Sequence, residues 1–150
     1  MKRQTPPMGC EIRSARLGDN ERLSELFGEL GYAASPEQVA DRMHEPNTQV
    51  LVAEQDGEVL GVVVLHVRQP VHRDGPVMRI DALVVTGARR SMGIGEALVR
   101  QALAEADRCG ATLVEITSKL PRTGARRFYE RLGFVVVGHQ FKMTLERPTP

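Results

Sequence analysis

Two periods of hydrophobic and polar residues run through the chain, and together they predict an α/β fold. Apolar residues recurring every three or four positions predict helices over 19–31, 36–45, 93–108 and 123–132. β-Branched or alternating apolar runs predict strands over 11–15, 48–54, 58–67, 77–86, 112–117, 134–137 and 141–145. Because the two kinds of element are interspersed, we expect one sheet of mixed pairing with helices packed on it.

Turn and capping residues fix several of these boundaries. Asp19 can cap the first helix, and Ser35 followed by Pro36 is typical of the start of the second. The pair Asp56-Gly57 separates two apolar runs and predicts a hairpin turn, because its glycine tolerates a positive φ. We found no internal repeat and no low-complexity segment.

Length and charge are those of one modest domain. The chain of 150 residues carries 20 Lys and Arg against 19 Asp and Glu, a formal net charge of +1. We therefore expect a single domain over 1–150 with its core at about 10–147, and no field strong enough to bind nucleic acid. The four histidines are dispersed without ligand spacing, so no metal is expected.

The cysteines and the N-terminal residues indicate a compartment. Cys10 and Cys109 form no CxxC pair, and two cysteines in a chain this long are typical of reduced thiols. Residues 1–7 carry charge but precede no apolar run, so we expect neither a signal peptide nor a membrane anchor. Both observations favour the cytoplasm.

Residues 80–99 hold the most informative pattern, a buried strand that runs through a basic, glycine-containing loop into a helix. Backbone N–H groups and the positive end of the helix dipole can face a diphosphate there, and Arg89 and Arg90 add charge. A Rossmann loop would need a third glycine where Leu98 stands, and a Walker A loop would need Gly-Lys-Ser/Thr. The spacing that fits is Arg90-x-x-Gly93-x-Gly95.

This hexamer resembles the acyl-CoA pyrophosphate loop of the GNAT family of N-acetyltransferases. About thirty residues further on, residues 125–134 (Ala-Arg-Arg-Phe-Tyr-Glu-Arg-Leu-Gly-Phe) resemble the second signature of that family, and the resemblance covers nearly the whole chain. It implies a GNAT-type fold, with a central mixed sheet of six or seven strands flanked by about four helices. It also implies transfer of an acetyl group from acetyl-CoA to a primary amine, without a metal or a covalent enzyme intermediate.

The resemblance assigns roles to individual residues. The backbone N–H of Leu83 would stabilise the oxyanion where a bulge separates two strands, Val85 would pair with the pantetheine amides, and Tyr129 would protonate the departing thiolate. The residues expected to bind the cofactor are Leu83, Val84, Val85, Arg90, Ser91, Met92, Gly93, Ile94, Gly95, Glu96 and Arg122. Arg122 stands at the position where many members of the family have an asparagine that contacts the cofactor, so the chain departs from the family pattern at this residue. The alternative for Tyr129 is a buried tyrosine that packs with Phe128 and Phe134.

Asp81 is the candidate general base, because an alkylammonium must lose a proton before it can attack. With an amine pKa near 10, only about one part in a thousand is free base at pH 7. Strict alternation along 77–86 places Asp81 on one face with Arg79, Leu83 and Val85. An aspartate that merely pairs with Arg79 or Arg68 is an equal alternative.

The acceptor stays open between small-molecule and peptide amines, because the residues that would shape its pocket lie on variable loops and helices. The resemblance also implies that the chain can form a homodimer. A catalytically silent acyl-CoA-binding sensor is the alternative to an enzyme, and the presence of Tyr129 argues against it.

Overall fold

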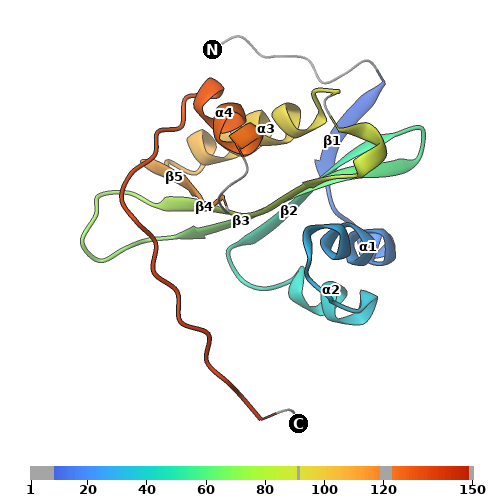
Figure 1. Cartoon of the computed structure of the whole chain (residues 1–150), viewed down its shortest axis with the longest axis horizontal. Coiled ribbons are helices and arrows are strands. Elements are labelled where there is room, and N and C mark those ends of the chain that lie inside the picture. Colours follow the sequence, from blue (N-terminus) through green and yellow to red (C-terminus); the bar gives the residue numbers. More distant parts are fainter. Residues whose placement is uncertain (1–8, 91, 119–122, 149–150) are drawn as a thin grey trace. The chain divides into compact units, whose positions relative to one another are not determined.

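Five strands and three of the four α-helices form the first part of the computed structural model, which describes residues 9–90, 92–118 and 123–148 (Figure 1). The chain forms two compact units, one up to Thr117 and one from Ser118 onward. The strands of the first unit are β1 (Cys10–Ser14), β2 (Thr48–Gln55), β3 (Glu58–Arg68), β4 (Val77–Val85) and β5 (Leu113–Ile116). Its helices are η1 (Leu17–Asp19), α1 (Asn20–Leu30), α2 (Pro36–Arg42), η2 (Gly87–Arg89) and α3 (Ile94–Arg108).

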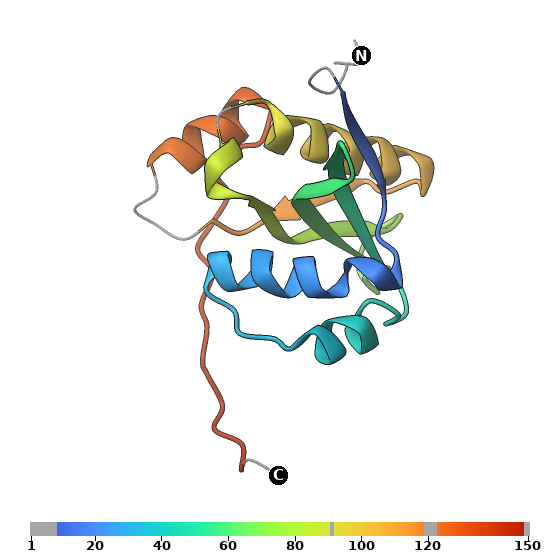
Figure 2. The ribbon, with the colours of Figure 1, turned by 90° about the vertical axis from the view of Figure 1, so that its right-hand side faces the viewer.

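The sheet has the order β1-β2-β3-β4-β5, in which only β4 and β5 are parallel. A parallel pair needs a crossover, and α3 supplies it. Figure 2 shows α3 on one face of the sheet, and α1 and α2 on the opposite face. The predicted α/β architecture with mixed pairing is therefore confirmed.

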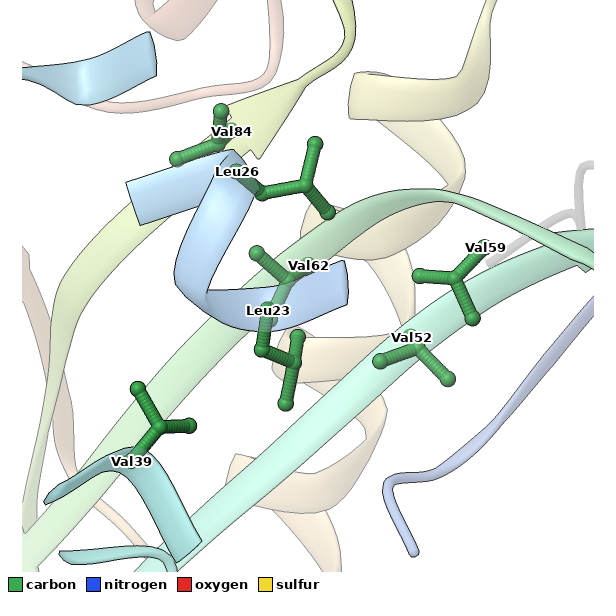
Figure 3. Close-up of a cluster of buried hydrophobic side chains, with 7 residues drawn as sticks. All are labelled: Leu23, Leu26, Val39, Val52, Val59, Val62 and Val84. Atoms are coloured by element: carbon green, nitrogen blue, oxygen red, sulfur yellow. The ribbon is translucent and has the colours of Figure 1, made fainter. Parts of the chain in front are cut away.

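The core on the α1 face joins both helices to three strands. Its buried side chains are Leu23, Leu26, Val39, Val52, Val59, Val62 and Val84 (Figure 3). On the other face, Ile94, Leu98 and Ala102 of α3 are at most 2% exposed. Apolar residues at helical spacing thus meet the strands from both sides, as the sequence pattern predicts.

Local signals fixed by single residues are confirmed. The hydroxyl of Ser35 accepts a hydrogen bond from the backbone N–H of Gln38 at 3.1 Å and caps α2. Asp56 and Gly57 both have positive φ, 52° and 80°, as a tight hairpin turn between β2 and β3 requires. The helix α2 is shorter than predicted and ends at Arg42.

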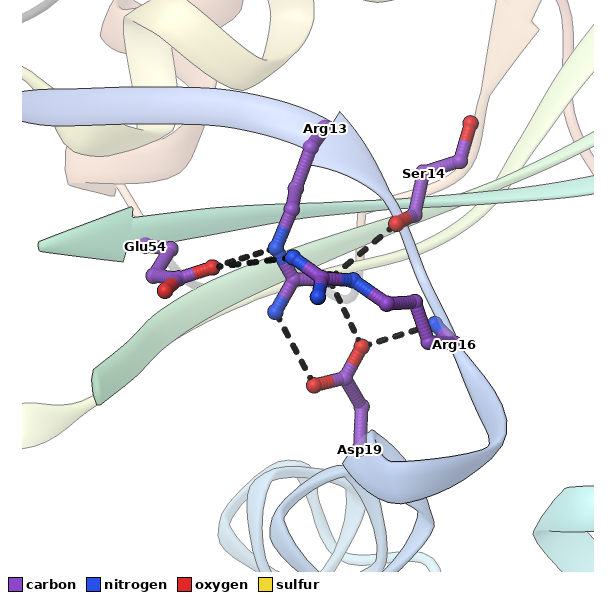
Figure 4. Close-up of polar contacts among 5 residues, drawn as sticks. All are labelled: Arg13, Ser14, Arg16, Asp19 and Glu54. Carbon is purple, nitrogen blue, oxygen red and sulfur yellow. Dashed lines mark hydrogen bonds and ion pairs between the residues drawn. The ribbon is translucent and has the colours of Figure 1, made fainter. Parts of the chain in front are cut away.

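Asp19 lies at the N-cap of α1, but its carboxylate serves a different partner (Figure 4). Arg13 of β1 donates to both of its oxygens, at 2.8 and 3.0 Å, and also to Glu54 of β2. The backbone N–H of Arg16 donates to Asp19 Oδ2 at 2.7 Å. The hydrogen bonds from Arg13 lower the pKa of Asp19. This half-buried charge network joins two strands to the start of α1.

The second unit contains α4 (Thr123–Arg131), which confirms the helix predicted at 123–132. The strands predicted over 134–137 and 141–145 do not form, so the described sheet has five strands instead of six or seven. Within this segment Val137 and Phe141 are 81% and 92% exposed. High β-propensity stabilises a strand only when a neighbour covers its apolar face, and an isolated hairpin is marginal in water.

Candidate functional site

A bulge interrupts β4 next to the predicted site. Along β3, Val64 and Leu65 are neighbours, whereas their partners on β4 are Ala82 and Ile80. Asp81 therefore lies opposite no residue of β3 in the described register. Bulges bend a strand and end regular pairing, and they often lie beside functional sites.

The bulge reverses the alternation of side chains on β4. The sequence predicts that Arg79, Asp81 and Leu83 share a face. In the structure Arg79 lies opposite His66 and Leu83 lies opposite Val63, and these two residues of β3 point to opposite faces. The shared face predicted for Arg79 and Leu83 is therefore wrong, because one extra residue shifts the period of two.

Beyond the bulge, β4 is no longer paired with β5. The described pairs between the two strands end at Ile80 and Ile116, whereas β4 itself runs on to Val85. This separation is the splayed arrangement expected around Leu83. It leaves one side of the last part of β4 without a neighbouring strand in the described sheet.

The hydrogen-bond phase of β4 shows which residues face that open side. The backbone N–H of Thr86 donates to the carbonyl of Leu60 at 2.8 Å. Because residues bonded to one neighbour alternate along an antiparallel strand, the backbone groups of Leu83 and Val85 point away from β3. The Nε of Arg90 donates to the carbonyl of Val85 at 3.4 Å, in agreement with this phase.

The side chains of the three predicted residues lie in different surroundings. Val84 is 4% exposed and packs in the α1-side core, so its side chain serves the fold. Leu83 and Val85 are half-buried. Of these three residues, Leu83 and Val85 are the two whose backbone groups take no part in the pairing with β3.

The basic loop leads from this open side into α3. Gly93 has φ 83° at the N-cap, a conformation that favours glycine, and Ile94 begins the helix with its side chain buried. The first-turn residue Glu96 pairs with Arg100 at 3.0 Å, and Met92 is 52% exposed. The loop thus presents the N-terminal end of a fifteen-residue helix beside β4.

Sequence reasoning missed the role of Glu29 in holding this loop. Glu29 lies near the end of α1, and its Oε1 accepts a hydrogen bond from the backbone N–H of Gly87 at 3.1 Å. The two residues lie 58 positions apart, so no local pattern could have paired them. The contact fastens the start of the loop to the helix on the α1 face.

Asp81 is an exposed carboxylate with a basic neighbour. Its Oδ1 lies 3.4 Å from Nε of Arg79, and Nη2 of Arg79 donates to the hydroxyl of Thr117 at 2.6 Å. Arg68 pairs instead with Glu115, at 3.7 Å. The alternative in which Asp81 pairs with Arg79 is thus realised, and the pairing leaves the carboxylate open to solvent.

Tyr129 belongs to the second unit and packs between two phenylalanines. Its ring lies 5.0 Å from that of Phe128 and 5.7 Å from that of Phe134, both edge to face. Burial raises the pKa of Tyr129 above its ordinary value near 10. The phenol is therefore fully protonated at neutral pH, as a proton donor must be.

Two predicted cofactor residues, Ser91 and Arg122, lie outside the described residues. Within the described ranges, no three His, Cys, Asp or Glu side chains gather in a way that could hold a metal ion. Nor is any described helix both long and apolar enough to cross a bilayer.

Comparison with known proteins connects this geometry to a family. The model of the acetyltransferase (GNAT) family matches residues 18–134. An aminoalkylphosphonate N-acetyltransferase of Salmonella typhimurium is 33% identical over 130 residues, which cover 83% of this chain and 84% of that protein. A mycothiol acetyltransferase of Nocardia farcinica is 36% identical over 87% of this chain but only 40% of its own length. An acetyltransferase structure from Trypanosoma brucei shares the fold, with a TM-score of 0.80 at 24% identity, over 91% of this chain and 99% of that one.

Proposed function

The chain belongs to the acetyltransferase (GNAT) family, and from this premise we propose that it moves an acetyl group from acetyl-CoA to a small primary amine in a ternary complex. That it is an N-acetyltransferase follows from the family and from its aminoalkylphosphonate N-acetyltransferase relative. One observation carries the proposal. β4 parts from β5 after Ile80 and exposes the backbones of Leu83 and Val85 beside the loop that opens α3.

The open side of β4 suits the pantetheine arm of the donor. Amides of an extended ligand can bond to Val85 as an added strand would. Arg90 now donates to the carbonyl of Val85, and it is exposed. Ligand amides that take over this carbonyl would free the guanidinium for the diphosphate. The loop amides from Ser91 to Glu96 would hold the same diphosphate.

The proposed chemistry uses three groups of this chain. Asp81, directly or through water, accepts a proton from the ammonium, and the amine nitrogen then bonds to the thioester carbon. The backbone N–H of Leu83 stabilises the negative oxygen that forms. As the C–S bond breaks, the thiolate takes a proton from Tyr129, and the attacking nitrogen gives up its second proton, through water, to the Tyr129 phenolate. This yields the neutral amide, free coenzyme A and the phenol restored.

A thiol-release assay tests this proposal. Purified protein is given acetyl-CoA and a panel of amines, and Tyr129→Phe is expected to lower kcat by roughly 100-fold with little change in KM. Arg108→Gln, which alters an exposed arginine at the end of α3, is the control and should keep full activity. Full activity of Tyr129→Phe would remove the proposed acid. Binding of acetyl-CoA without thiol release by any amine would favour the silent sensor.

The relative's name suggests the first acceptor to try. Its acceptor class is an aminoalkylphosphonate, and we propose a small amine of this kind as acceptor here.

The free thiols Cys10 and Cys109 accord with the proposed cytoplasmic location. The homodimer stays a prediction, which light scattering can check.

A further inference from the structure

Six charged or polar side chains lie across three strands next to the bulge in β4. We call them the polar row: His66, Arg68, Arg79, Asp81, Glu115 and Thr117. Arg79 of β4 stands directly opposite His66 of β3 on one side and beside Glu115 of β5 on the other. His66 shares its face of the sheet with Val62, four residues earlier, so the row continues the α1-side face. There the buried apolar surface of β2 and β3 gives way to charge.

The charges of the row are paired loosely and stay open to water. Arg68 and Glu115 are 3.7 Å apart, with side chains 50% and 36% exposed. Arg79 and Asp81 are 3.4 Å apart, with side chains 32% and 45% exposed. Exposed pairs of this kind contribute little to stability, so the pairing alone does not account for the row. Such pairs can exchange partners at small cost.

We infer that the polar row is the recognition site for an acceptor that carries both an amine and an acidic group. The two arginines would bind the acidic group, and Asp81 would face the ammonium. This inference rests on the proposed function and deepens it, because it names the residues that would select the acceptor class.

Geometry favours a short spacer between the two groups of the acceptor. Asp81 lies two residues from Arg79 and two from Leu83, whose N–H faces the open side of β4. Two residues of a strand span about 7 Å, less where a bulge shortens it. An amine at Asp81 is thus beside the predicted site of attack, while an acidic group two or three carbons away reaches Arg79. The hydroxyl of Thr117, 2.6 Å from Nη2, holds the guanidinium in the row.

The row is also balanced for a zwitterion. Its two arginines and two carboxylates sum to no net charge, counting His66 as neutral. A guanidinium binds a phosphonate or carboxylate through two parallel donors, and a carboxylate binds an ammonium. An acceptor that carries only the amine would offer no acidic group for Arg79 and Arg68 to bind.

Two acceptors of similar length test the inference, 2-aminoethylphosphonate and n-propylamine. For the wild type we expect kcat/KM to be roughly 10- to 100-fold higher with the phosphonate, as one charge-assisted interaction would give. Arg79→Gln should remove most of this preference by raising KM for the phosphonate. Because Arg79 is also the ion-pair partner of Asp81, kcat/KM for propylamine is expected to fall as well, but several-fold less than kcat/KM for the phosphonate. Arg79→Lys should recover part of the preference. Arg108→Gln, which alters an exposed, ion-paired arginine at the end of α3, is the matched control.

The outcomes separate the two proposals. Equal use of both acceptors by the wild type, or an equal loss with both in Arg79→Gln, would overturn the polar row as a recognition site and leave acetyl transfer standing. No thiol release with any amine would overturn the proposed function and this inference with it. Melting temperatures of the variants, compared with that of the wild type, show whether Arg79→Gln is folded. If it is not, the preference of Arg79→Lys for the phosphonate over propylamine tests the inference instead.

Discussion

At the scale of single residues, the proposed chemistry depends most on a group that no side-chain pattern reveals, the backbone N–H of Leu83. The phase of the β3–β4 pairing points it away from β3, to the side that β5 has left. A backbone donor cannot be removed by an ordinary substitution, but proline removes it. Because this N–H takes no part in the pairing with β3, proline here costs no hydrogen bond of that ladder.

We therefore predict that Leu83→Pro lowers kcat by roughly 100- to 1000-fold, the usual effect of removing one oxyanion donor. Leu83→Ala is the matched control, since it loses the same packing and keeps the N–H. Its kcat should stay within about tenfold of the wild type. Steady-state thiol release measures both variants. Equal kcat values in the two would show that the N–H takes no part.

Asp19 is a second residue whose surroundings lead to a prediction, here for how the stability of the fold depends on pH. Hydrogen bonds from Arg13 lower its pKa in the folded chain, so its charge stabilises the fold above about pH 4, its ordinary value. As pH falls through the lowered pKa, the carboxylate is protonated and this contribution is lost. The stabilisation is thus present at neutral pH and absent in acid.

Asp19→Asn should lower the free energy of unfolding at pH 7 by about 1–3 kcal/mol, because it weakens a half-buried, charge-assisted pair. The difference from the wild type should shrink as pH falls below about 4 and through the lowered pKa of Asp19. Urea unfolding at a series of pH values measures it. Glu25→Gln breaks the exposed pair with Arg22 and should change stability by less than about 0.5 kcal/mol. A difference for Asp19→Asn that is constant with pH would contradict the assignment.

At the scale of elements, local signals predicted the structure well and long-range ones did not. Ser35 and the pair Asp56-Gly57 fix a cap and a turn through their own backbone, so the sequence alone located them. The bulge at Asp81 depends on how β3 pairs with β4. Strict alternation of side chains could not include it, and therefore wrongly predicted that Arg79 and Leu83 share a face. The bond between Glu29 and Gly87 joins elements far apart along the chain.

The C-terminal segment also shows that a local pattern does not determine long-range pairing. Residues 134–137 and 141–145 have the composition of strands, yet no strand forms there in the described chain. Composition reports what a segment can do when a neighbouring strand is present. The family resemblance, by contrast, implied both a bulge in this strand and its separation from the next strand around Leu83, and the structure shows both features.

The packing of α3 on the sheet gives a prediction at this scale. A Cβ added to Gly61 of β3 would lie 3.1 Å from Leu98 of α3 and 3.1 Å from the carbonyl of Val84. In Gly61→Ala, the side chain of Leu98 and the backbone of Val84 must each give by a few tenths of an ångström, and because the Val84 carbonyl is held in the sheet we expect a loss of about 1–3 kcal/mol in the free energy of unfolding.

Gly28→Ala is the opposite control. No atom lies within 4 Å of its added Cβ on the exposed side of α1, so alanine should stabilise the helix by about 0.5–1 kcal/mol. Urea unfolding of both variants gives the two signs. A stabilised Gly61→Ala would show that α3 does not pack as closely as described.

At the scale of the whole molecule, the loop and the open side of β4 predict how ligands shift its stability. The net charge of +1 gives no general attraction for anions, so a shift must come from a specific site. In the proposed site, acetyl-CoA would bond to both the loop amides and the backbone of Val85, whereas ATP and NAD offer phosphates without the pantetheine arm. At roughly a hundredfold excess over its Kd, acetyl-CoA should add about 2.7 kcal/mol to the free energy of unfolding, and ATP and NAD much less. Thermal unfolding with each ligand measures the shift, and an equal shift by all three would mean that the loop binds phosphate without regard to the arm.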